Sequence, residues 1–560
     1  MRRLILILPI VLFLHCKKQP ATPTGLVTEK AMVVSARAEA SKIGSEIMEK
    51  GGNAFDAMIA TELALAVAYP YAGNIGGGGF MVYRKSNGDI GAIDYREKAP
   101  LSAHKDMYLD SLGNVIPNMS TVGATAVGVP GTVAGVVEVH EKFGSLPFSE
   151  ILAPVIALAK KGVVVTEKQA KRLEHHREQI MTVSGDSTKL AANYKPGDTI
   201  KYPELARTLE KIQKHGRDGF YKGEIAQKLT AFIQEKGGYI TEEDLEKYEA
   251  KWRQPVVFDY KDLKLISMSP PSSGGVTMNQ IFKMMESHDI SDYGHNSTKS
   301  VQLFTEAARR AYADRNYFLG DPDFVSIPLD VLLSDDYLEE RMQGFSFEKP
   351  TPSSEVSHGV VEIIESDETT HYSIVDNQGN AISATTTLNG AYGSKLYSDE
   401  LGFFFNNEMD DFSAKPGIPN MFGLIGAEAN SIAPEKRMLS SMTPTIVEKD
   451  GKLFMVVGTP GGSTIITAVA QTILNVYEFN LSMQEAVNAP RFHHQWLPDL
   501  IIFEEEGFSN ELKSELKGIG YKIHEGRNRI IGKVDAIRVL PDGKLEGGAD
   551  KRGDDTAVGF

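Results

Sequence analysis

Residues 369–387 have the pattern of a β-hairpin whose first residue, Thr369, could carry out chemistry. Two runs in which polar and β-forming side chains alternate flank a glycine-containing turn at residues 377–380. If the hairpin folds about Gln378, Thr369 lies opposite Thr387, within one residue if the turn glycine forms a bulge. The sequence therefore predicts two threonine hydroxyls close together at the open end of a hairpin.

Thr369 would be an effective nucleophile if the chain were cut immediately before it. A threonine hydroxyl is weakly nucleophilic until a base removes its proton, and an N-terminal threonine carries that base as its own α-amine. An α-amine has an unperturbed pKa of about 7.7–8.0, so part of it is neutral near physiological pH. Two threonines at the head of a strand are also common for their β-propensity alone, so the pattern needs support from other segments.

Four downstream features could form a pocket for an amino acid. Glu408 and Asp411 could hold an ammonium group, and the pair Ser440-Ser441 with a guanidinium could hold a carboxylate. The pair Gly461-Gly462 offers two backbone N–H groups, as an oxyanion site requires. Each segment taken alone is also consistent with an ordinary acidic loop, polar turn or glycine turn.

Taken together and in order, these motifs resemble the γ-glutamyltranspeptidase (γ-glutamyltransferase) family of the N-terminal-nucleophile hydrolase superfamily. The resemblance covers nearly all of the chain beyond roughly the first thirty residues. The matching segments are residues 51–57, 74–81, 94–100, 129–131, 270–275, 369–373, 406–417 and 489–496. One such match would be a weak signal, but many in the same order make a strong one.

The resemblance implies an enzyme without a cofactor that cleaves itself and then uses its new N-terminus. The Thr369 hydroxyl would attack the carbonyl of Glu368, leaving one chain that ends at Glu368 and another from Thr369 to Phe560. The new α-amine would act as general base. A γ-glutamyl compound such as glutathione would acylate Thr369, and water, an amino acid or a peptide would then accept the γ-glutamyl group.

The resemblance also assigns the substrate pocket. The residues that would bind the substrate α-carboxylate are Arg96, Ser440 and Ser441. The residues that would bind its α-ammonium are Asn389, Glu408 and Asp411. Thr387 would hydrogen-bond the nucleophile, and the N–H groups of Gly461 and Gly462 would bind the oxyanion. Because ligands lacking either charge would leave buried charges unpaired, we expect γ-glutamyl donors rather than α-linked peptides.

Two positions differ from some relatives. Some bacterial members carry a tyrosine on the loop that covers the pocket, and the corresponding residue here is Phe422, two residues past Asn420. Phenylalanine can shield the site but cannot donate a hydroxyl hydrogen bond, which leaves open the balance of hydrolysis against transfer. Glu408 is glutamine in some relatives, and either side chain can accept a hydrogen bond from an ammonium.

The composition is that of a globular enzyme, with 42% hydrophobic and 24% charged residues. A net charge of −15 with scattered Lys and Arg argues against a nucleic-acid partner. No metal site is expected, because the pairs His175-His176 and His493-His494 lack neighbouring Cys or carboxylate clusters. We expect the first pair to be solvated and the second to be structural.

The N-terminus has the features of an export signal. Arg2-Arg3 precede an apolar core over residues 4–14, which is too short to span a bilayer comfortably. The core ends near Cys16, the only cysteine, which favours a bacterial lipoprotein lipidated at Cys16. His15 stands where a small residue is preferred, so an ordinary signal peptide is the alternative. The expected location is periplasmic or lipid-anchored to a bacterial membrane.

Elements before the hairpin must position these groups. Residues 31–50 have helical spacing, and Asn53 is expected to cap a buried helix over residues 54–67. The glycine run 76–79 lacks phosphate-binding or dinucleotide-binding spacing, so we expect it to allow close backbone packing near the active site. Residues 145–330 are predicted to be mainly helical.

The sequence pattern predicts an α+β fold. The resemblance implies a four-layer αββα sandwich, the N-terminal-nucleophile hydrolase fold, formed jointly by two chains cut from one precursor. The predicted organisation is an export signal over residues 1–16, a tether over 17–30, a large subunit over 31–368 and a small subunit over 369–560, which together form a heterodimer.

Two alternatives remain. A related acylase of the cephalosporin or glutaryl type, or a capsule-polymer transferase, would share the nucleophile but differ at the pocket. Arg96, Asp411 and the pair Ser440-Ser441 favour the γ-glutamyl interpretation. A surface lipoprotein that keeps the fold as a binding module without turnover is the second alternative.

Overall fold

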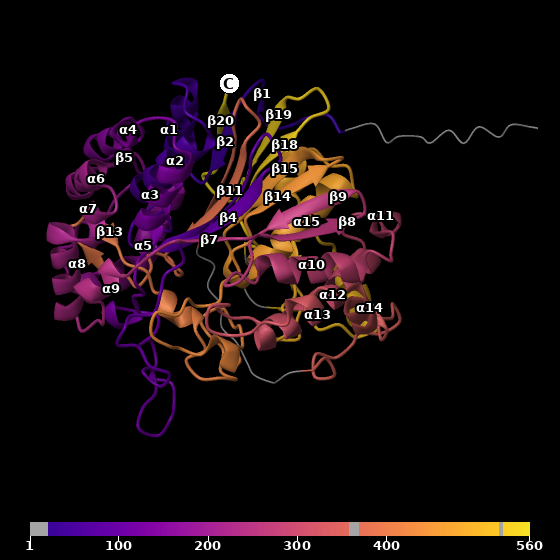
Figure 1. The fold of residues 1–560 in the computed structure, drawn as a ribbon. Coiled ribbons are helices and arrows are strands. Elements are labelled where there is room, and N and C mark those ends of the chain that lie inside the picture. The colour runs from indigo at the N-terminus through magenta and orange to yellow at the C-terminus, as the bar shows by residue number, and fades with distance from the viewer. Residues whose placement is uncertain (1–20, 358–368, 526–529) are drawn as a thin grey trace, which may run out of the picture.

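The computed structural model describes residues 21–357, 369–525 and 530–560. Two seven-stranded antiparallel sheets pack against each other, and helices cover the outer face of each sheet (Figure 1). This arrangement confirms the predicted α+β class and the four-layer αββα sandwich. Glu368 and Cys16, at which cleavage and lipidation are predicted, lie outside the described residues.

One sheet carries the predicted hairpin in its centre. Its strands, in spatial order, are β20 (Thr556–Gly559), β2 (Met32–Ser35), β10 (Thr370–Val375), β11 (Ala381–Thr387), β3 (Gly78–Arg84), β4 (Ile90–Asp94) and β7 (Lys251–Arg253). Thr370 pairs with Thr386 and Val375 with Ala381, which is the predicted register. Thr369, immediately before β10, therefore lies at the end of the hairpin where Thr387 ends β11.

The second sheet packs against the first through an apolar interior. Its strands, in spatial order, are β1 (Val27–Thr28), β19 (Leu545–Ala549), β18 (Asp535–Val539), β15 (Lys452–Gly458), β14 (Thr445–Lys449), β9 (Leu263–Ser267) and β8 (Val256–Tyr260). Each sheet combines strands from before and after Thr369. The two predicted subunits would therefore build both sheets together.

Helices of the first outer layer come from the N-terminal part of the chain. They are α1 (Ala38–Glu49), α2 (Ala54–Ala68), α3 (Thr132–Phe143), α4 (Phe148–Lys161), α5 (Glu167–Ser184), α6 (Pro203–His215), α7 (Asp218–Tyr221), α8 (Gly223–Glu235) and α9 (Glu242–Glu246). Asn53 caps α2 as predicted, and the structure adds a capping box with Asp56. The predicted helix over 31–50 is wrong at its start, because Met32–Ser35 pairs between β10 and β20 as a strand.

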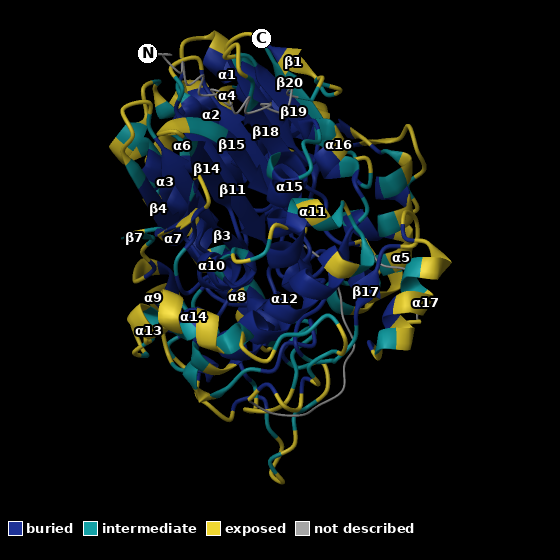
Figure 2. Ribbon diagram, turned by 90° about the vertical axis from the view of Figure 1, so that its right-hand side faces the viewer, coloured by how far each residue is buried: buried dark blue, intermediate teal, exposed yellow. Residues whose placement is uncertain are grey.

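Helices of the opposite layer flank the second sheet. They are α10 (Gly274–Met285), α11 (Ile290–Tyr293), α12 (Thr298–Phe318), α13 (Leu329–Leu332), α14 (Asp335–Met342), α15 (Ile465–Tyr477), α16 (Met483–Asn488) and α17 (Asn510–Ile519). The short strands β5 (Val163–Val164), β6 (Thr199–Ile200), β12 (Tyr397–Ser398), β13 (Phe403–Phe404), β16 (Phe492–His493) and β17 (Ile502–Phe503) form three small pairs. Figure 2 shows the sheets and α15 in the buried interior, with α14 and α17 exposed at the rim.

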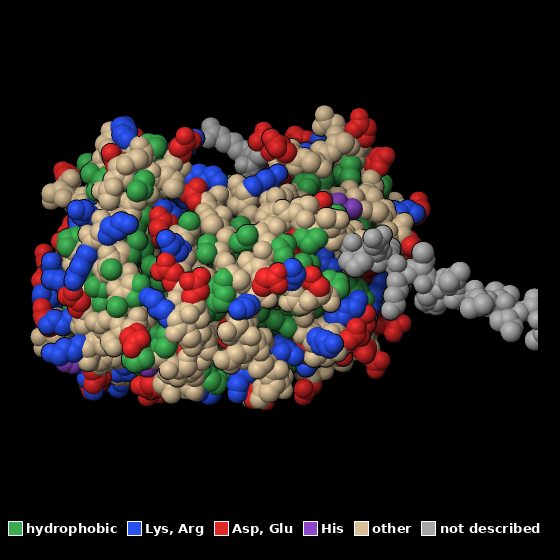
Figure 3. All heavy atoms as spheres, turned by 90° about the horizontal axis from the view of Figure 1, so that it is seen from above, with side chains coloured by type: hydrophobic (Ala, Val, Ile, Leu, Met, Phe, Trp, Pro, Cys, Tyr) green, Lys and Arg blue, Asp and Glu red, His purple; other side chains and the backbone are tan. Residues whose placement is uncertain are grey.

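The surface carries charges of both signs. On the face drawn in Figure 3, Lys and Arg alternate with Asp and Glu, and no large patch of one sign is visible. Across the described residues, no helix has the length and apolar character needed to cross a membrane. The same residues contain no group of three or more His, Cys, Asp or Glu placed to hold a metal ion.

Both histidine pairs can be placed in the fold. His493 is buried, its ring contacts Thr467 Oγ1 at 2.7 Å and Gln495 Oε1 at 2.9 Å, and burial lowers its pKa to about 3. This neutral ring is consistent with the structural role expected for the second pair. His175 is exposed as expected, but His176 is partly buried against Tyr392, so that expectation is wrong for His176.

A buried carboxyl on α2, Glu62, gives a prediction for the pH dependence of stability. Its side chain is 0% exposed and accepts a hydrogen bond from the Tyr372 hydroxyl at 2.6 Å. Burial raises the pKa of Glu62 from 4.5 to about 7 despite that hydrogen bond. The folded protein therefore holds the proton more tightly than the unfolded chain, and this group lowers stability as the pH rises between these two values.

We expect Glu62→Gln to remove this pH-dependent loss of unfolding free energy. The loss amounts to about 3 kcal/mol, because a shift of one pKa unit corresponds to about 1.36 kcal/mol. Urea unfolding at pH 5 and pH 8 in a Thr369→Ala background would measure it on one uncut polypeptide. Glu49→Gln, at the exposed end of α1, is the matched control. An unchanged pH dependence in Glu62→Gln would refute the assignment.

Candidate active site

A pocket lies at the open end of the hairpin. The predicted site residues that line it are Arg96, Thr369, Thr387, Asn389, Asp411, Phe422, Ser440, Ser441 and Gly462. Glu408 and Gly461 are not among the lining residues: Glu408 forms an ion pair with Arg96, and Gly461 directly precedes Gly462. The structure thus brings together residues that lie more than 350 positions apart in the sequence.

Thr369 is held in the pocket with its side chain 4% exposed. Next to it, Thr387 Oγ1 accepts a hydrogen bond from the Asn389 backbone N–H at 2.7 Å. Asn389 adopts a left-handed backbone conformation with φ of 70°, which asparagine tolerates better than most residues. The Thr387 hydroxyl is therefore held in place by the same segment that lines the predicted ammonium site.

The glycine run 76–79 packs directly against the end of β11. A Cβ atom on Gly77 would lie 2.1 Å from the Thr387 carbonyl oxygen. Asn74 links the glycine run to the end of β11, because its Nδ2 donates to Thr387 O at 2.8 Å and its Oδ1 accepts from Gly77 N at 2.9 Å. The glycines thus allow close backbone packing beside Thr387 at the predicted active site, as expected.

The predicted charged residues are paired with one another in this structure. Arg96 Nη1 lies 2.6 Å from Glu408 Oε2, and Arg96 Nη2 forms an ion pair with Asp411. Burial raises the pKa of both carboxyls, while the Arg96 charge lowers it. Burial also opposes the charge of Arg96, but Glu408, Asp411 and Glu97 together raise its pKa. A ligand that carries its own ammonium and carboxylate could exchange partners with this cluster.

The pair Ser440-Ser441 is framed by residues 270–275. Ser440 N donates to Pro271 O at 2.9 Å, and the Ser273 hydroxyl donates to Ser440 O at 2.7 Å. The Ser272 hydroxyl donates to Met442 O at 2.6 Å. The segment 270–275, for which no role was predicted, therefore fixes the backbone of the two serines.

The Gly461-Gly462 turn begins a 3-10 segment, Gly462–Thr464, that leads into α15. Their φ angles are 138° and 52°, a region that favours glycine. A Cβ atom on Gly462 would lie 2.5 Å from the Phe422 ring. The start of a helix presents N–H groups that lack helical partners, which suits an oxyanion site.

Phe422 lies on the loop over the pocket and is 4% exposed. The loop is held by Asn420 Nδ2, which donates to Asp411 Oδ1 at 3.1 Å, and by Met421 N, which donates to Asp410 Oδ2 at 2.9 Å. Gln495 Nε2 donates to Phe422 O at 3.3 Å. Asp411 therefore contacts both Arg96 and the covering loop.

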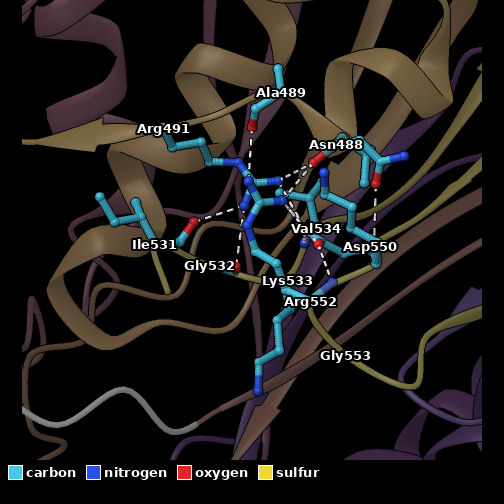
Figure 4. Close-up of polar contacts among 12 residues, drawn as sticks. Asn488, Ala489, Arg491, Ile531, Gly532, Lys533, Val534, Asp550, Arg552 and Gly553 are labelled. Atoms are coloured by element: carbon cyan, nitrogen blue, oxygen red, sulfur yellow. Dashed lines mark hydrogen bonds and ion pairs between the residues drawn. The ribbon is translucent and has the colours of Figure 1, made fainter. Parts of the chain in front are cut away.

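Figure 4 shows a network of polar contacts that joins Arg491, Asp550 and Arg552 to the backbone of residues 531–534. Arg491 Nη1 donates to the carbonyl oxygens of Ile531 at 2.7 Å and Gly532 at 3.1 Å, and Arg491 Nη2 pairs with Asp550 at 2.8 Å. A Cβ atom on Gly461 would lie 3.3 Å from the Gly532 Cα atom. The network thus holds the segment against which the glycine turn rests.

Sequence reasoning missed four residues that line the pocket. They are Arg315, Leu424, Met442 and Ile465. Arg315 had a detectable signal, because it continues the buried face of α12 formed by Phe304, Ala308 and Ala311. A charged residue on such a face indicates a specific polar partner.

A buried threonine at the head of an inner strand, in a four-layer αββα sandwich, defines an N-terminal-nucleophile hydrolase. The γ-glutamyltranspeptidase family model matches residues 40–560. The chain is 44% identical over 537 residues to the glutathione hydrolase proenzyme of Escherichia coli (strain K12), covering 95% of this chain and 92% of that protein. The chain belongs to the γ-glutamyltranspeptidase family.

Solved structures agree with this assignment. The γ-glutamyltranspeptidase of Helicobacter pylori is 43% identical with a TM-score of 0.58, covering 59% of this chain and 96% of that chain. The cephalosporin acylase of Bacillus halodurans is 24% identical with a TM-score of 0.83, covering 99% of both chains. At that identity the acylase shows the common fold alone.

Proposed function

We propose that this chain is an autoprocessing γ-glutamyltransferase and glutathione hydrolase whose nucleophile is Thr369. One observation carries the proposal: Thr369 shares a pocket with Arg96, Asp411 and the pair Ser440-Ser441, which suit the charged end of a γ-glutamyl group. Membership in the family supports the same activity. The proenzyme name of the Escherichia coli relative supports maturation by cleavage.

Self-cleavage would begin with attack of Thr369 Oγ on the Glu368 carbonyl carbon. The peptide C–N bond breaks, the proton of the hydroxyl passes to the departing nitrogen, and an ester joins Glu368 to Thr369. Water then hydrolyses the ester, which frees the Glu368 carboxylate and the Thr369 hydroxyl and leaves the α-amine as the new N-terminus.

Turnover would use the same hydroxyl with the α-amine as general base. The amine takes the hydroxyl proton as Oγ attacks the γ-carbonyl of the donor, and it returns that proton to the leaving amine. The N–H groups of Gly461 and Gly462 would stabilise the oxyanion, and Thr387 would orient the nucleophile. Water or an acceptor amine then breaks the γ-glutamyl ester.

Donor specificity tests this function against the acylase alternative. We expect γ-glutamyl-4-nitroanilide to be cleaved with a kcat/KM at least about 100-fold above that of glutaryl-4-nitroanilide, because glutaryl leaves Glu408 and Asp411 without an ammonium partner. A preference for the glutaryl donor would support an acylase. Absence of both activities in protein that stays uncut would support a binding module.

We also propose, from the sequence, that the chain is exported and anchored by lipid on Cys16, and that amino acids or dipeptides serve as acceptors. The apolar core that ends near Cys16 supports the anchor. Membrane fractionation of wild-type and Cys16→Ser protein, with fatty-acid labelling, tests it. An unlabelled wild-type protein would support an ordinary signal peptide.

A further inference from the structure

Arg315 is a second arginine at the pocket, and none of the proposed reaction steps uses it. It lies near the C-terminal end of α12, lines the pocket beside Ser441 and is 3% exposed. Burial lowers the pKa of its guanidinium to about 10, so the group carries its charge at neutral pH.

The charge of Arg315 is compensated differently from that of Arg96. Arg315 Nε donates to Ser273 Oγ at 3.0 Å, Nη1 to Asn316 Oδ1 at 2.8 Å and Nη2 to Ser441 Oγ at 3.0 Å. All these partners are neutral oxygens, and no carboxylate of the described residues forms an ion pair with it. Arg96, by contrast, forms ion pairs with Glu97, Glu408 and Asp411. The charge of Asp411 acts on Arg315 without an ion pair between the two side chains. A buried cation with no carboxylate in direct contact is costly, so this position favours an anionic ligand.

The hydrogen bond from Arg315 to Ser441 also determines the direction in which the Ser441 hydroxyl proton can point. Ser441 Oγ accepts the Arg315 N–H, and Ser440 Oγ accepts the Met442 backbone N–H at 3.2 Å. Within the described residues neither serine hydroxyl donates to another protein atom. Both O–H groups are therefore available to a ligand in the pocket they line together with Arg315.

We propose that Arg315 is a positioning residue that makes the pocket selective for the substrate α-carboxylate. It holds Ser441 so that the hydroxyl proton faces the ligand, and it supplies a positive charge that forms no ion pair with a carboxylate of the described residues. Ser273 links Arg315 to the backbone of Ser440, so one arginine organises both serines. The inference rests on the proposed γ-glutamyl transfer function.

Three 4-nitroanilide donors separate the two ends of the pocket. The γ-glutamyl donor has both the α-ammonium and the α-carboxylate, the glutaryl donor keeps only the carboxylate, and the 4-aminobutanoyl donor keeps only the ammonium. For Arg315→Met we expect kcat/KM to fall about 100-fold with the first two donors and to change less than about threefold with the third. The loss should be mainly in KM, because the residue binds the ground state as well as the transition state.

Two further variants control for stability and for charge. Arg310→Met removes another buried arginine of α12, which pairs with Glu306 rather than lining the pocket. We expect it to lower Tm without changing the ratio of kcat/KM between donors. Arg315→Lys keeps the charge but cannot reach Ser273 and Ser441 together, so we expect a loss of about tenfold.

Coupling with Ser441 tests the positioning role directly. Ser441→Ala should lower kcat/KM much less in the Arg315→Met background than in the wild type, because the arginine orients that hydroxyl. Equal losses with all three donors, additive effects of the two substitutions, or failure of both Arg315→Met and Arg315→Lys to mature would overturn the proposal and indicate a structural arginine. Lack of γ-glutamyl cleavage by the wild-type enzyme would instead refute the proposed function.

Discussion

Thr369→Ala is expected to leave the chain uncut and to reduce γ-glutamyl cleavage at least about a thousandfold. Alanine has no hydroxyl to attack the Glu368 carbonyl, so neither the ester nor the new α-amine forms. A denaturing gel should show one band of about the full 61.3 kDa mass less any removed signal, whereas the wild type should give two fragments. Mass spectrometry of the smaller wild-type fragment should find an N-terminus at Thr369.

Thr370→Val is the matched control for this experiment. Thr370 adjoins Thr369, is 0% exposed, and its hydroxyl has no hydrogen-bond partner among the described residues, so valine keeps its shape at little cost. We expect this variant to be cut and active. Thr369→Ser should also be cut, because it retains the hydroxyl. Cleavage of Thr369→Ala at the same bond, or a wild-type N-terminus elsewhere, would refute the proposed nucleophile.

Asp411→Asn is expected to have the second largest effect, lowering kcat/KM for γ-glutamyl donors about 100- to 1000-fold. The substitution keeps the size of the side chain but removes a buried charge that pairs with Arg96 and accepts from Asn420 on the covering loop. Breaking one partner of a buried ion pair costs about 3–5 kcal/mol, and each 1.36 kcal/mol is about tenfold in rate.

The donor series distinguishes this effect from that of Arg315. Asp411→Asn should impair the γ-glutamyl and 4-aminobutanoyl donors, which carry the ammonium, and should spare the glutaryl donor. Asp410→Asn is the matched control, because the adjacent carboxylate contacts Ser120 and Met421 instead of Arg96. We expect kcat/KM of Asp410→Asn to fall by about tenfold or less. An equal loss in both variants, or an equal loss with all donors, would argue that Asp411 does not bind the ammonium.

Local patterns predicted the parts of this protein whose geometry depends on neighbouring residues. The register of β10 with β11 followed from the spacing about Gln378, because a hairpin turn sets which residues pair. The helix cap at Asn53 and the close packing of the glycine run were also predicted, because both depend on the types of residues adjacent in the chain. The order of the motifs predicted the family and, through it, the fold and most of the pocket-lining residues.

Contacts between distant segments decided the rest. Met32–Ser35 is a strand rather than the start of a helix because β10 and β20 lie on either side of it, and no local pattern contains those partners. Arg315 reaches the pocket only because α12 packs with its buried face toward Ser273 and Ser441. The ion pairs of Arg96 with Glu408 and Asp411 likewise depend on a fold that joins the two halves of the chain.

The sequence by itself predicted the hairpin, the threonine proposed as nucleophile and the set of groups that suit a zwitterionic ligand, since these depend on residue type and short spacing. Only the tertiary structure decided which charges neutralise one another and which remain available. Electrostatic interactions in a buried pocket depend on distances and desolvation, which are set by packing across the sheets rather than by order along the chain.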